Sequence, residues 1–253
     1  MKLTFLGTGT SQGVPIIGST HPVCLSNDER DKRLRVSVLI DWDDKTYLID
    51  CGPDFRQQML RANPAKIDAI IYTHEHTDHV LGLDDIRPFV YRQGQIPIYA
   101  EPKVINALKQ RFDYVFEEEN KYFGRPAVVI NEISSAPFDI QDHHIIPIEV
   151  NHNGLPILGF RFENLAYITD AKIIEEKEHE KLQDLDVLVI NALRHESHVS
   201  HFTLEEALEF IKVIKPKRAY LTHISHLLGF HEEVSKTLPP NVFLAYDNLT
   251  ITI

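Results

Sequence analysis

One short segment limits what this chain can fold into. Residues 73–79, with the sequence THEHTDH, directly follow an apolar predicted strand at residues 69–72. On a strand-to-helix turn, side chains two residues apart can point together while the next Asp and His point to a second position, so two metal ions can share one loop. A polar surface loop with incidental histidines is the alternative, but so dense a string after an apolar strand favours a metal site. The potential ligands are His74, His76, Asp78 and His79.

The composition is that of a globular protein. With 253 residues, 43% of them hydrophobic and 25% charged, the chain can bury a substantial core. No linker rich in Pro, Gly or Ser divides it, which favours a single domain over residues 1–253. No apolar run approaches the ~20 residues of a membrane helix, and Cys24 and Cys51 are too few for a disulfide framework. We therefore expect a soluble, cytoplasmic protein that does not bind membranes.

The charge of the chain bears on its partners. The formal net charge of -11 makes nucleic acid an unexpected main partner, because affinity for nucleic acid depends largely on Lys and Arg. Bound divalent metals would offset part of the acidic charge at the site itself. A small-molecule substrate is the expectation that follows.

Short apolar runs alternate with helical patterns along the whole chain. Two β-sheets with outer helices are the simplest arrangement for such a series. An acidic run at residues 117–119 is expected to be a solvated turn. Strands are expected at residues 3–5, 36–40, 46–49, 69–72, 128–133, 144–150, 159–162, 165–169, 187–191 and 219–222, a closing hairpin at 242–246 and 249–253, and helices at 53–60, 102–112, 171–182 and 203–214.

The histidine string resembles the signature of the metallo-β-lactamase superfamily. The resemblance implies an α+β fold, a four-layer αββα sandwich of two mixed sheets flanked by helices. It also implies that Asp50 braces the histidine loop. His152 then matches the third ligand of the first metal, Asp170 the carboxylate that bridges both metals, and His223 the last ligand of the second metal.

Each of these three residues has an alternative role when it is taken alone. His152 and His223 could be polar groups at strand ends, and Asp170 could cap a helix that begins near residue 171. However, each follows a predicted strand, as a site along one edge of a sandwich requires. The first metal would be held by His74, His76, His152 and Asp170, and the second by Asp78, His79, Asp170 and His223. Zn²⁺ suits such nitrogen and carboxylate ligands, with Mn²⁺ or Fe as alternatives.

The N-terminal region narrows the resemblance. Residues 7–15 (GTGTSQGVP), 24–26 (CLS) and 30–35 (RDKRLR) together resemble the PhnP family of phosphoribosyl cyclic phosphate phosphodiesterases. That family usually carries a structural zinc site, for which this chain offers only His21, Cys24 and His226. Because structural zinc normally takes four protein ligands, we expect this site to be lost or weakened, with polar contacts holding the loop.

A second group of histidines, at residues 195–201, precedes a predicted helix. His201 matches the position from which phosphodiesterases of the superfamily place a histidine over the reacting phosphate, although a surface residue at a helix start is the alternative. His198 is a candidate for the pocket wall. We expect two divalent ions to convert a bridging water to hydroxide. Asp78, as a ligand, and His201, as an imidazolium with a pKa near 7, are the expected catalytic residues.

The resemblance therefore predicts a metal-dependent phosphodiesterase that acts on a small cyclic phosphodiester. An RNA-processing nuclease resembling tRNase Z shares the metal motif, but the acidity and the lack of a basic protruding arm argue against it. Hydrolysis of a β-lactam, thioester or lactone uses similar metals. A non-catalytic accessory protein resembling PqqB is the alternative from another class, and the intact ligand set argues against it. A homodimer remains open.

Overall fold

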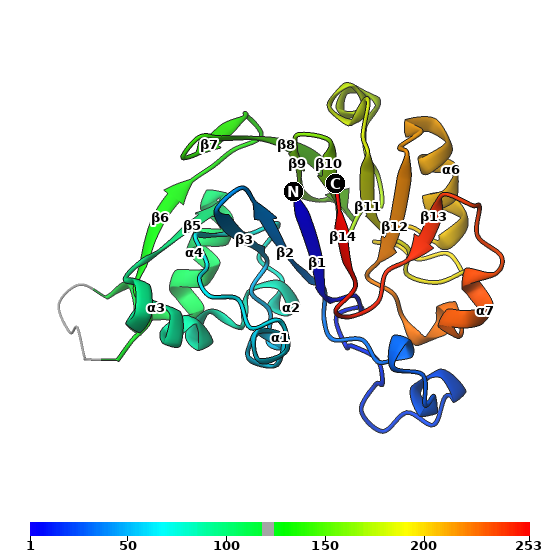
Figure 1. Ribbon diagram of the computed structural model, residues 1–253, viewed down its shortest axis with the longest axis horizontal. Coiled ribbons are helices and arrows are strands. Elements are labelled where there is room, and N and C mark those ends of the chain that lie inside the picture. The colour runs from blue at the N-terminus through cyan, green and yellow to red at the C-terminus, as the bar shows by residue number, and fades with distance from the viewer. Residues whose placement is uncertain (118–123) are drawn as a thin grey trace.

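The chain forms two mixed β-sheets that pack face to face, with helices on both outer surfaces (Figure 1). The computed structural model describes residues 1–117 and 124–253. In these residues the first sheet has the order β14 (Thr250–Thr252), β1 (Lys2–Gly7), β2 (Ser37–Trp42), β3 (Lys45–Ile49), β4 (Ala69–Ile71), β5 (Ile96–Ala100) and β6 (Val128–Glu132). The second has the order β13 (Val242–Leu244), β12 (Arg218–Thr222), β11 (Val187–Asn191), β10 (Leu165–Tyr167), β9 (Leu155–Phe162), β8 (His143–His152) and β7 (Phe138–Ile140).

The layers follow from where the apolar side chains point. One buried cluster, with Leu3, Phe5 and Tyr47 from the first sheet and Phe160 and Tyr167 from the second, fills the space between the sheets. Two further clusters lie under the outer helices. Along the first sheet these helices are α1 (Phe55–Ala62), α2 (Thr77–Val80), α3 (Arg87–Gln93), α4 (Pro102–Arg111) and α5 (Asp113–Phe116), and along the second they are α6 (Leu204–Ile214) and α7 (His231–Ser235). The expected α+β, four-layer αββα sandwich is confirmed.

Helix α6 shows how local sequence sets an element beside the candidate site. Thr203 accepts a hydrogen bond from the backbone N–H of Glu206, and the Glu206 carboxylate accepts one from the backbone N–H of Thr203. This reciprocal cap satisfies two of the free N–H groups at the helix start. Buried Leu204, Ala207 and Ile211 then hold the helix against the second sheet. The start of α6, and with it the loop that carries His201, is therefore firmly placed.

The predicted helix at residues 171–182 is wrong. Only a 3₁₀ helix forms there, at Glu176–Leu182. The residues just before this 3₁₀ helix form hydrogen bonds with the backbone of Asn151 instead. The N–H of Asn151 donates to the carbonyl of Ile173, and its carbonyl accepts from the N–H of Lys172. The segment is thus held extended against the end of β8. Helical propensity was overridden by this pairing, which local sequence does not reveal.

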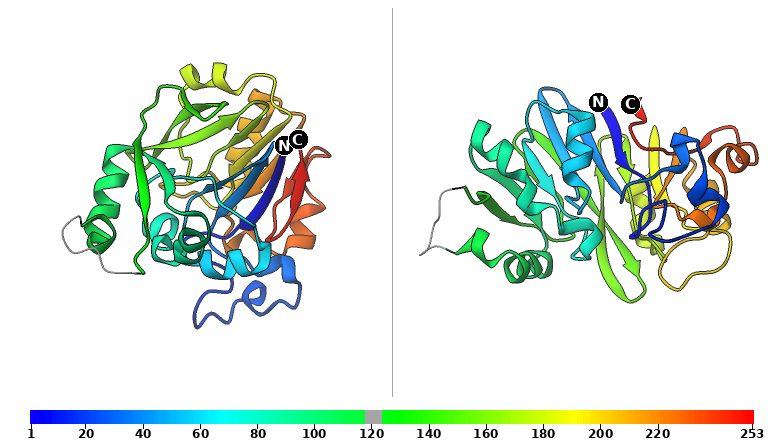
Figure 2. Two further views of the ribbon diagram at one scale, coloured as in Figure 1. Left: turned by 60° about the vertical axis from the view of Figure 1, so that its left-hand side comes forward. Right: turned by 90° about the horizontal axis from the view of Figure 1, so that it is seen from below.

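The predicted hairpin at the C-terminus is also wrong. β13 pairs in parallel with β12 in the second sheet, whereas β14 pairs antiparallel with β1 in the first. Figure 2 shows the two chain ends side by side, where β1 and β14 meet. The chain changes sheets between the two strands, and Asp247 anchors that crossing by accepting hydrogen bonds from Thr8 and from the backbone N–H of Leu34.

The remaining differences concern the start of one helix and several elements that were not predicted. The first helix begins at Phe55 rather than at residue 53, since the Asp54 carboxylate binds Arg35 instead of capping the helix. β5, β7, α3, α5 and α7 were not predicted. The acidic run lies, from residue 118 onward, outside the described residues. Among the described residues no helix is long and apolar enough to cross a membrane.

Candidate metal centre

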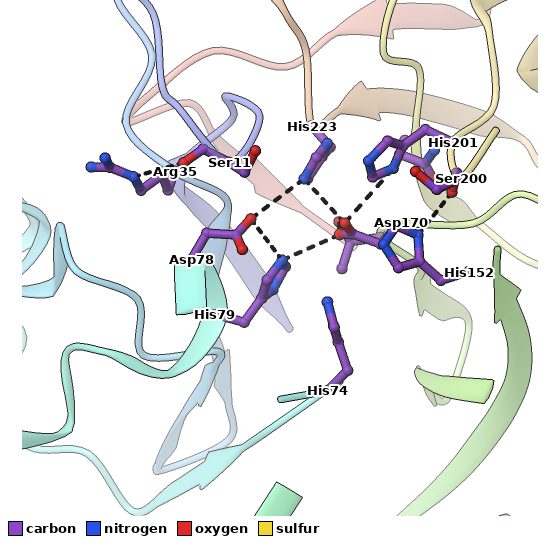
Figure 3. Close-up of polar contacts among 12 residues, drawn as sticks. Ser11, Arg35, His74, Asp78, His79, His152, Asp170, Ser200, His201 and His223 are labelled. Atoms are coloured by element: carbon purple, nitrogen blue, oxygen red, sulfur yellow. Dashed lines mark hydrogen bonds and ion pairs between the residues drawn. The ribbon is translucent and has the colours of Figure 1, made fainter. Parts of the chain in front are cut away.

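The predicted ligands meet at one edge of the sandwich, where strands of both sheets end (Figure 3). β4 leads into the loop with His74 and His76, and α2 carries Asp78 and His79. The second sheet contributes His152 at the end of β8, Asp170 after β10 and His223 after β12. Loops that follow four separate strands are thus brought together.

The side chains form overlapping groups whose potential ligand atoms all lie within 4.8 Å of one another. In the described residues one group is His74, His76 and His152, and another is Asp78, His79 and His223. Asp170 joins them, because its Oδ2 lies 3.3 Å from Nε2 of His79 and its Oδ1 lies 3.2 Å from Nε2 of His223. Asp170 thus lies between the two groups.

The neighbours of three histidines decide which nitrogen faces the centre. Nδ1 of His79 lies 2.7 Å from the Asp50 carboxylate, which can only accept, so this nitrogen carries the proton. Thr73 donates its hydroxyl proton to Asp50 and therefore accepts from Nδ1 of His74. Nδ1 of His152 donates to the carbonyl oxygen of Ser200 at 2.8 Å. In each ring the Nε2 lone pair is left free for a metal.

The sequence did not predict the contact between His152 and Ser200, because the two residues are 48 positions apart and the acceptor is a backbone carbonyl. No side-chain motif marks such a contact. The contact ties the loop that holds His201 to a ligand of the first group.

The buried nitrogens fit a bound cation. Nε2 of His74, His79 and His223 is buried and forms no hydrogen bond within the described part of the chain. Unpaired buried polar atoms are costly, and here they converge on two carboxylates. Burial opposes ionisation of Asp170, but the imidazoles of His223 and His79 outweigh it and hold the pKa of that carboxyl well below its usual range. Three imidazoles that surround an ionised carboxylate form a donor set that suits Zn²⁺ and similar ions.

Backbone geometry aims the ligands inward. Asp50, Asp170 and His223 each follow a strand and have φ values of 61°, 57° and 54°. Residues other than glycine rarely adopt this left-handed conformation, and it is concentrated at functional sites. The chain therefore accepts local strain at three strand ends in order to turn these side chains toward the centre.

Gly52 allows the first sheet to approach the histidine loop. A Cβ atom at this position would lie 2.1 Å from the carbonyl oxygen of Asp78. We expect Gly52→Ala to lower the free energy of unfolding by about 1–3 kcal/mol, as overpacking does in a tightly packed core. Urea denaturation measures this effect. A urea midpoint equal to that of wild type would show that the histidine loop moves aside without loss of stability.

Asp50 braces the loop from a fully buried position. Its Oδ1 accepts from the backbone N–H of Thr73 at 2.9 Å, while Oδ2 faces the Thr73 hydroxyl and His79. In Asp50→Asn an amide N–H₂ would face donors, so we expect metal affinity to fall about 10–100-fold. Competition with a chromogenic chelator measures this affinity. The exposed Asp139, replaced by Asn, serves as the control, and equal affinities in both variants would refute the bracing role.

His201 lies beside the centre, with Nδ1 3.7 Å from Oδ1 of Asp170 and its ring 4.6 Å from that of His223. The expected near-neutral pKa is not found. Burial, with the His223 imidazole second, lowers the pKa of His201 to about 2. The ring is therefore neutral at pH 7 in this structure, and it can serve as a hydrogen-bond donor rather than as a standing imidazolium.

The N-terminal zinc candidates come together only in part. The rings of His21 and His226 lie 4.8 Å apart, but among the described residues no third ligand, Cys24 included, joins them in a metal-holding group. Nδ1 of His21 is already used, since it accepts from the N–H of Val23. Instead, Asp31 accepts from the backbone N–H of His231 and so ties this loop to α7.

Comparison with known proteins agrees with this geometry. Residues 45–224 match the model of the beta-lactamase superfamily domain. The chain belongs to the metallo-β-lactamase superfamily. It is 41% identical to a solved protein described as a new diphosphatase from the PhnP family, with a TM-score of 0.93 and coverage of 100% of this chain and 97% of that one. It is therefore also a member of the PhnP family.

More distant structures share the fold alone. Zn²⁺-bound PqqB from Methylobacterium extorquens is 18% identical with a TM-score of 0.81, and each chain covers 100% of the other. The short form of human tRNase Z is 19% identical with a TM-score of 0.72, over 100% of this chain and 99% of that one.

Two named relatives carry conflicting names. A Porphyromonas gingivalis protein named octanoyltransferase is 41% identical over 100% of this chain and 52% of its own length. A ribonuclease Z from Exiguobacterium is 31% identical over 64% of this chain and 49% of its own length. The chain thus spans about half the length of these relatives.

Proposed function

We propose that this protein is a phosphodiesterase that binds two divalent metal ions, most suitably Zn²⁺, and hydrolyses a small cyclic phosphodiester. The observation that carries the proposal is Asp170, whose two oxygens lie 3.3 Å and 3.2 Å from Nε2 of His79 and His223 while His201 lies at 3.7 Å from the same carboxylate. Membership of the PhnP family supports a phosphorus-containing substrate.

In this proposal the ligands divide as the sequence indicated. His74, His76, His152 and Asp170 hold the first ion, and Asp78, His79, Asp170 and His223 hold the second. Divalent ions bound in such a pair supply Lewis-acid chemistry, which neutralises phosphate oxygens and makes water acidic enough to act as a nucleophile near neutral pH. Asp50 keeps the His79 tautomer that this binding needs.

His201 supplies a neutral donor. Its Nδ1 is buried and has no hydrogen bond within the described residues. A phosphate oxygen placed beside Asp170 is within reach of this ring, and a donor that is already in place stabilises charge as it builds up on that oxygen. We propose that His201 contacts the reacting phosphate and is not itself a metal ligand.

A second candidate is hydrolysis of a diphosphate, favoured by the name of the 41% identical PhnP-family structure. The same metal ions and the same donor, His201, suit hydrolysis of a cyclic phosphodiester and of a diphosphate. Ribonuclease activity is disfavoured by the net charge of -11. The octanoyltransferase name belongs to a protein about twice as long as this chain, so its activity can reside in the part that this chain does not match.

The decisive experiment is a turnover assay with protein of measured metal content. The panel contains bis(p-nitrophenyl) phosphate, a ribose 1,2-cyclic phosphate, an asymmetric diphosphate, an RNA with a 3′ extension and an octanoyl thioester. Chelator-sensitive cleavage with preference for the cyclic ester supports the proposal. Preference for the diphosphate moves the assignment to the second candidate, and two bound metals without cleavage of any phosphorus ester refute both.

A further inference from the structure

Asn191, the last residue of β11, holds the backbone next to Asp170. Its side chain is fully buried. The Oδ1 atom accepts a hydrogen bond from the N–H of Ala171 at 2.7 Å, and Nδ2 donates to the carbonyl of the same residue at 3.0 Å. One amide side chain thus pairs both backbone polar groups of the residue that follows Asp170. Because an unpaired buried polar group is costly, the backbone at Ala171 is firmly held.

The Ala171 carbonyl also holds the loop of His201. It accepts a second hydrogen bond, from the backbone N–H of Phe202 at 2.7 Å. A carbonyl oxygen has two lone pairs, and here one serves Asn191 and the other serves Phe202. Phe202 directly follows His201 in the chain. The backbone that carries the His201 ring is therefore tied, through one oxygen atom, to the residue beside Asp170.

Both site residues depend on this support. The φ of Asp170 is 57°, and a residue other than glycine keeps such a conformation only where its surroundings enforce it. Figure 3 shows His201 facing Asp170, with Nδ1 3.7 Å from Oδ1. This Nδ1 forms no hydrogen bond within the described part of the chain. The position of the ring beside the carboxylate is therefore set by the backbone of its loop.

We infer that Asn191 is a positioning residue, which holds the His201 ring at the distance from Asp170 at which it can donate to a phosphate oxygen. Asn191 does not touch the substrate and acts through His201. This inference rests on the proposed phosphoesterase function, and it adds a residue that lies outside both ligand sets.

Two substitutions separate the hydrogen bonds of Asn191 from its volume. Asn191→Leu keeps a side chain of similar size without donor or acceptor. Asn191→Asp keeps the acceptor for the N–H of Ala171, and burial raises the pKa of the introduced carboxyl. When this carboxyl is protonated, its O–H can donate to the Ala171 carbonyl and restore the second bond. Asn131→Leu is the matched control, because Asn131 also donates to backbone carbonyls but lies on β6, which carries no proposed ligand.

The first measurement is steady-state kinetics on a phosphoester that wild type cleaves, with the metal content of each variant determined. We expect Asn191→Leu to lower kcat ~10²-fold with little change in KM, as for a small misplacement of a group that acts in the transition state. Metal content should stay at the wild-type value. In a His201→Ala background the same substitution should lower kcat less than ~3-fold, because both changes then remove the same contribution. The control should change neither kcat nor metal content.

Two further readouts test the contact itself. Hydrogen exchange of the Phe202 amide, followed by NMR, requires no substrate and should be faster in Asn191→Leu than in wild type and in the control. The activity of Asn191→Asp should approach that of wild type at low pH. It should fall relative to wild type as the pH rises, because the introduced carboxyl then loses the proton that it donates. This variant also carries the test if Asn191→Leu does not fold.

Four results would overturn the inference. In the first, the losses from Asn191→Leu and His201→Ala multiply, so that Asn191 does not act through His201. In the second, metal is lost from Asn191→Leu in step with kcat, so that Asn191 supports only the ligand set. In the third, Asn191→Asp is as slow as Asn191→Leu at every pH. In the fourth, exchange of the Phe202 amide is unchanged. Failure of the proposed function differs from all four, because wild type would then cleave no phosphoester while the exchange measurement would still report on the contact.

Discussion

Asp170→Asn is expected to lower turnover by at least ~10³-fold, the scale of loss when a main electrostatic stabiliser is removed. The two carboxylate oxygens face histidines of different ligand groups, Nε2 of His79 at 3.3 Å and Nε2 of His223 at 3.2 Å. An amide has one oxygen and no charge, so it cannot serve both groups. Metal content per chain, measured by elemental analysis, should fall together with kcat.

Thermal melting gives a second measurement on the same variant. A ligand that binds only the folded state raises the melting temperature, so added metal should stabilise wild type and have a much smaller effect on Asp170→Asn. The exposed Asp139, replaced by Asn, controls for the loss of one carboxylate. A variant that kept two metals and near-normal kcat would show that Asp170 does not bridge.

His201→Ala is expected to lower kcat about 10²–10⁴-fold, the range for loss of a group that acts on the reacting atoms. Metal content should stay at the wild-type value, because the proposed ligand sets are complete without this ring. The measurement pairs steady-state kinetics with elemental analysis.

The metal content must be measured together with kcat because His152, Asp170 and His201 also lie close enough to hold an ion together. If one metal per chain were lost in His201→Ala, His201 would be a ligand rather than a donor to phosphate. Replacement of the exposed His144 by Ala should leave both kcat and metal content unchanged. A kcat equal to that of wild type in His201→Ala would remove this residue from the reaction.

The proposed ligands could be picked out in the sequence because each lies in a short-range pattern. The string at residues 73–79 and the polar residues at strand ends, such as His152 and His223, are visible in a few neighbouring positions. Strand-to-loop transitions are local, and alternating apolar residues mark the strands well. The fold class followed from the same features together with the family resemblance.

The wrong secondary-structure predictions concern segments whose backbone pairs with residues far away in the sequence. Asn151 holds residues 172 and 173 extended, and this contact removed the start of a predicted helix. At the C-terminus, β13 and β14 joined different sheets because each found its partner far along the chain, in β12 and β1. The acceptor for His152 is the carbonyl of Ser200, which carries no signature in the side-chain sequence.

The amino-acid sequence was enough to identify the residues that could hold metal and their order along the chain. The folded chain was needed to show that burial leaves His201 neutral and that Gly52 must lack a side chain against Asp78. Ligand chemistry belongs to single residues, whereas protonation, tautomer and close approach depend on groups that folding brings together from distant parts of the chain.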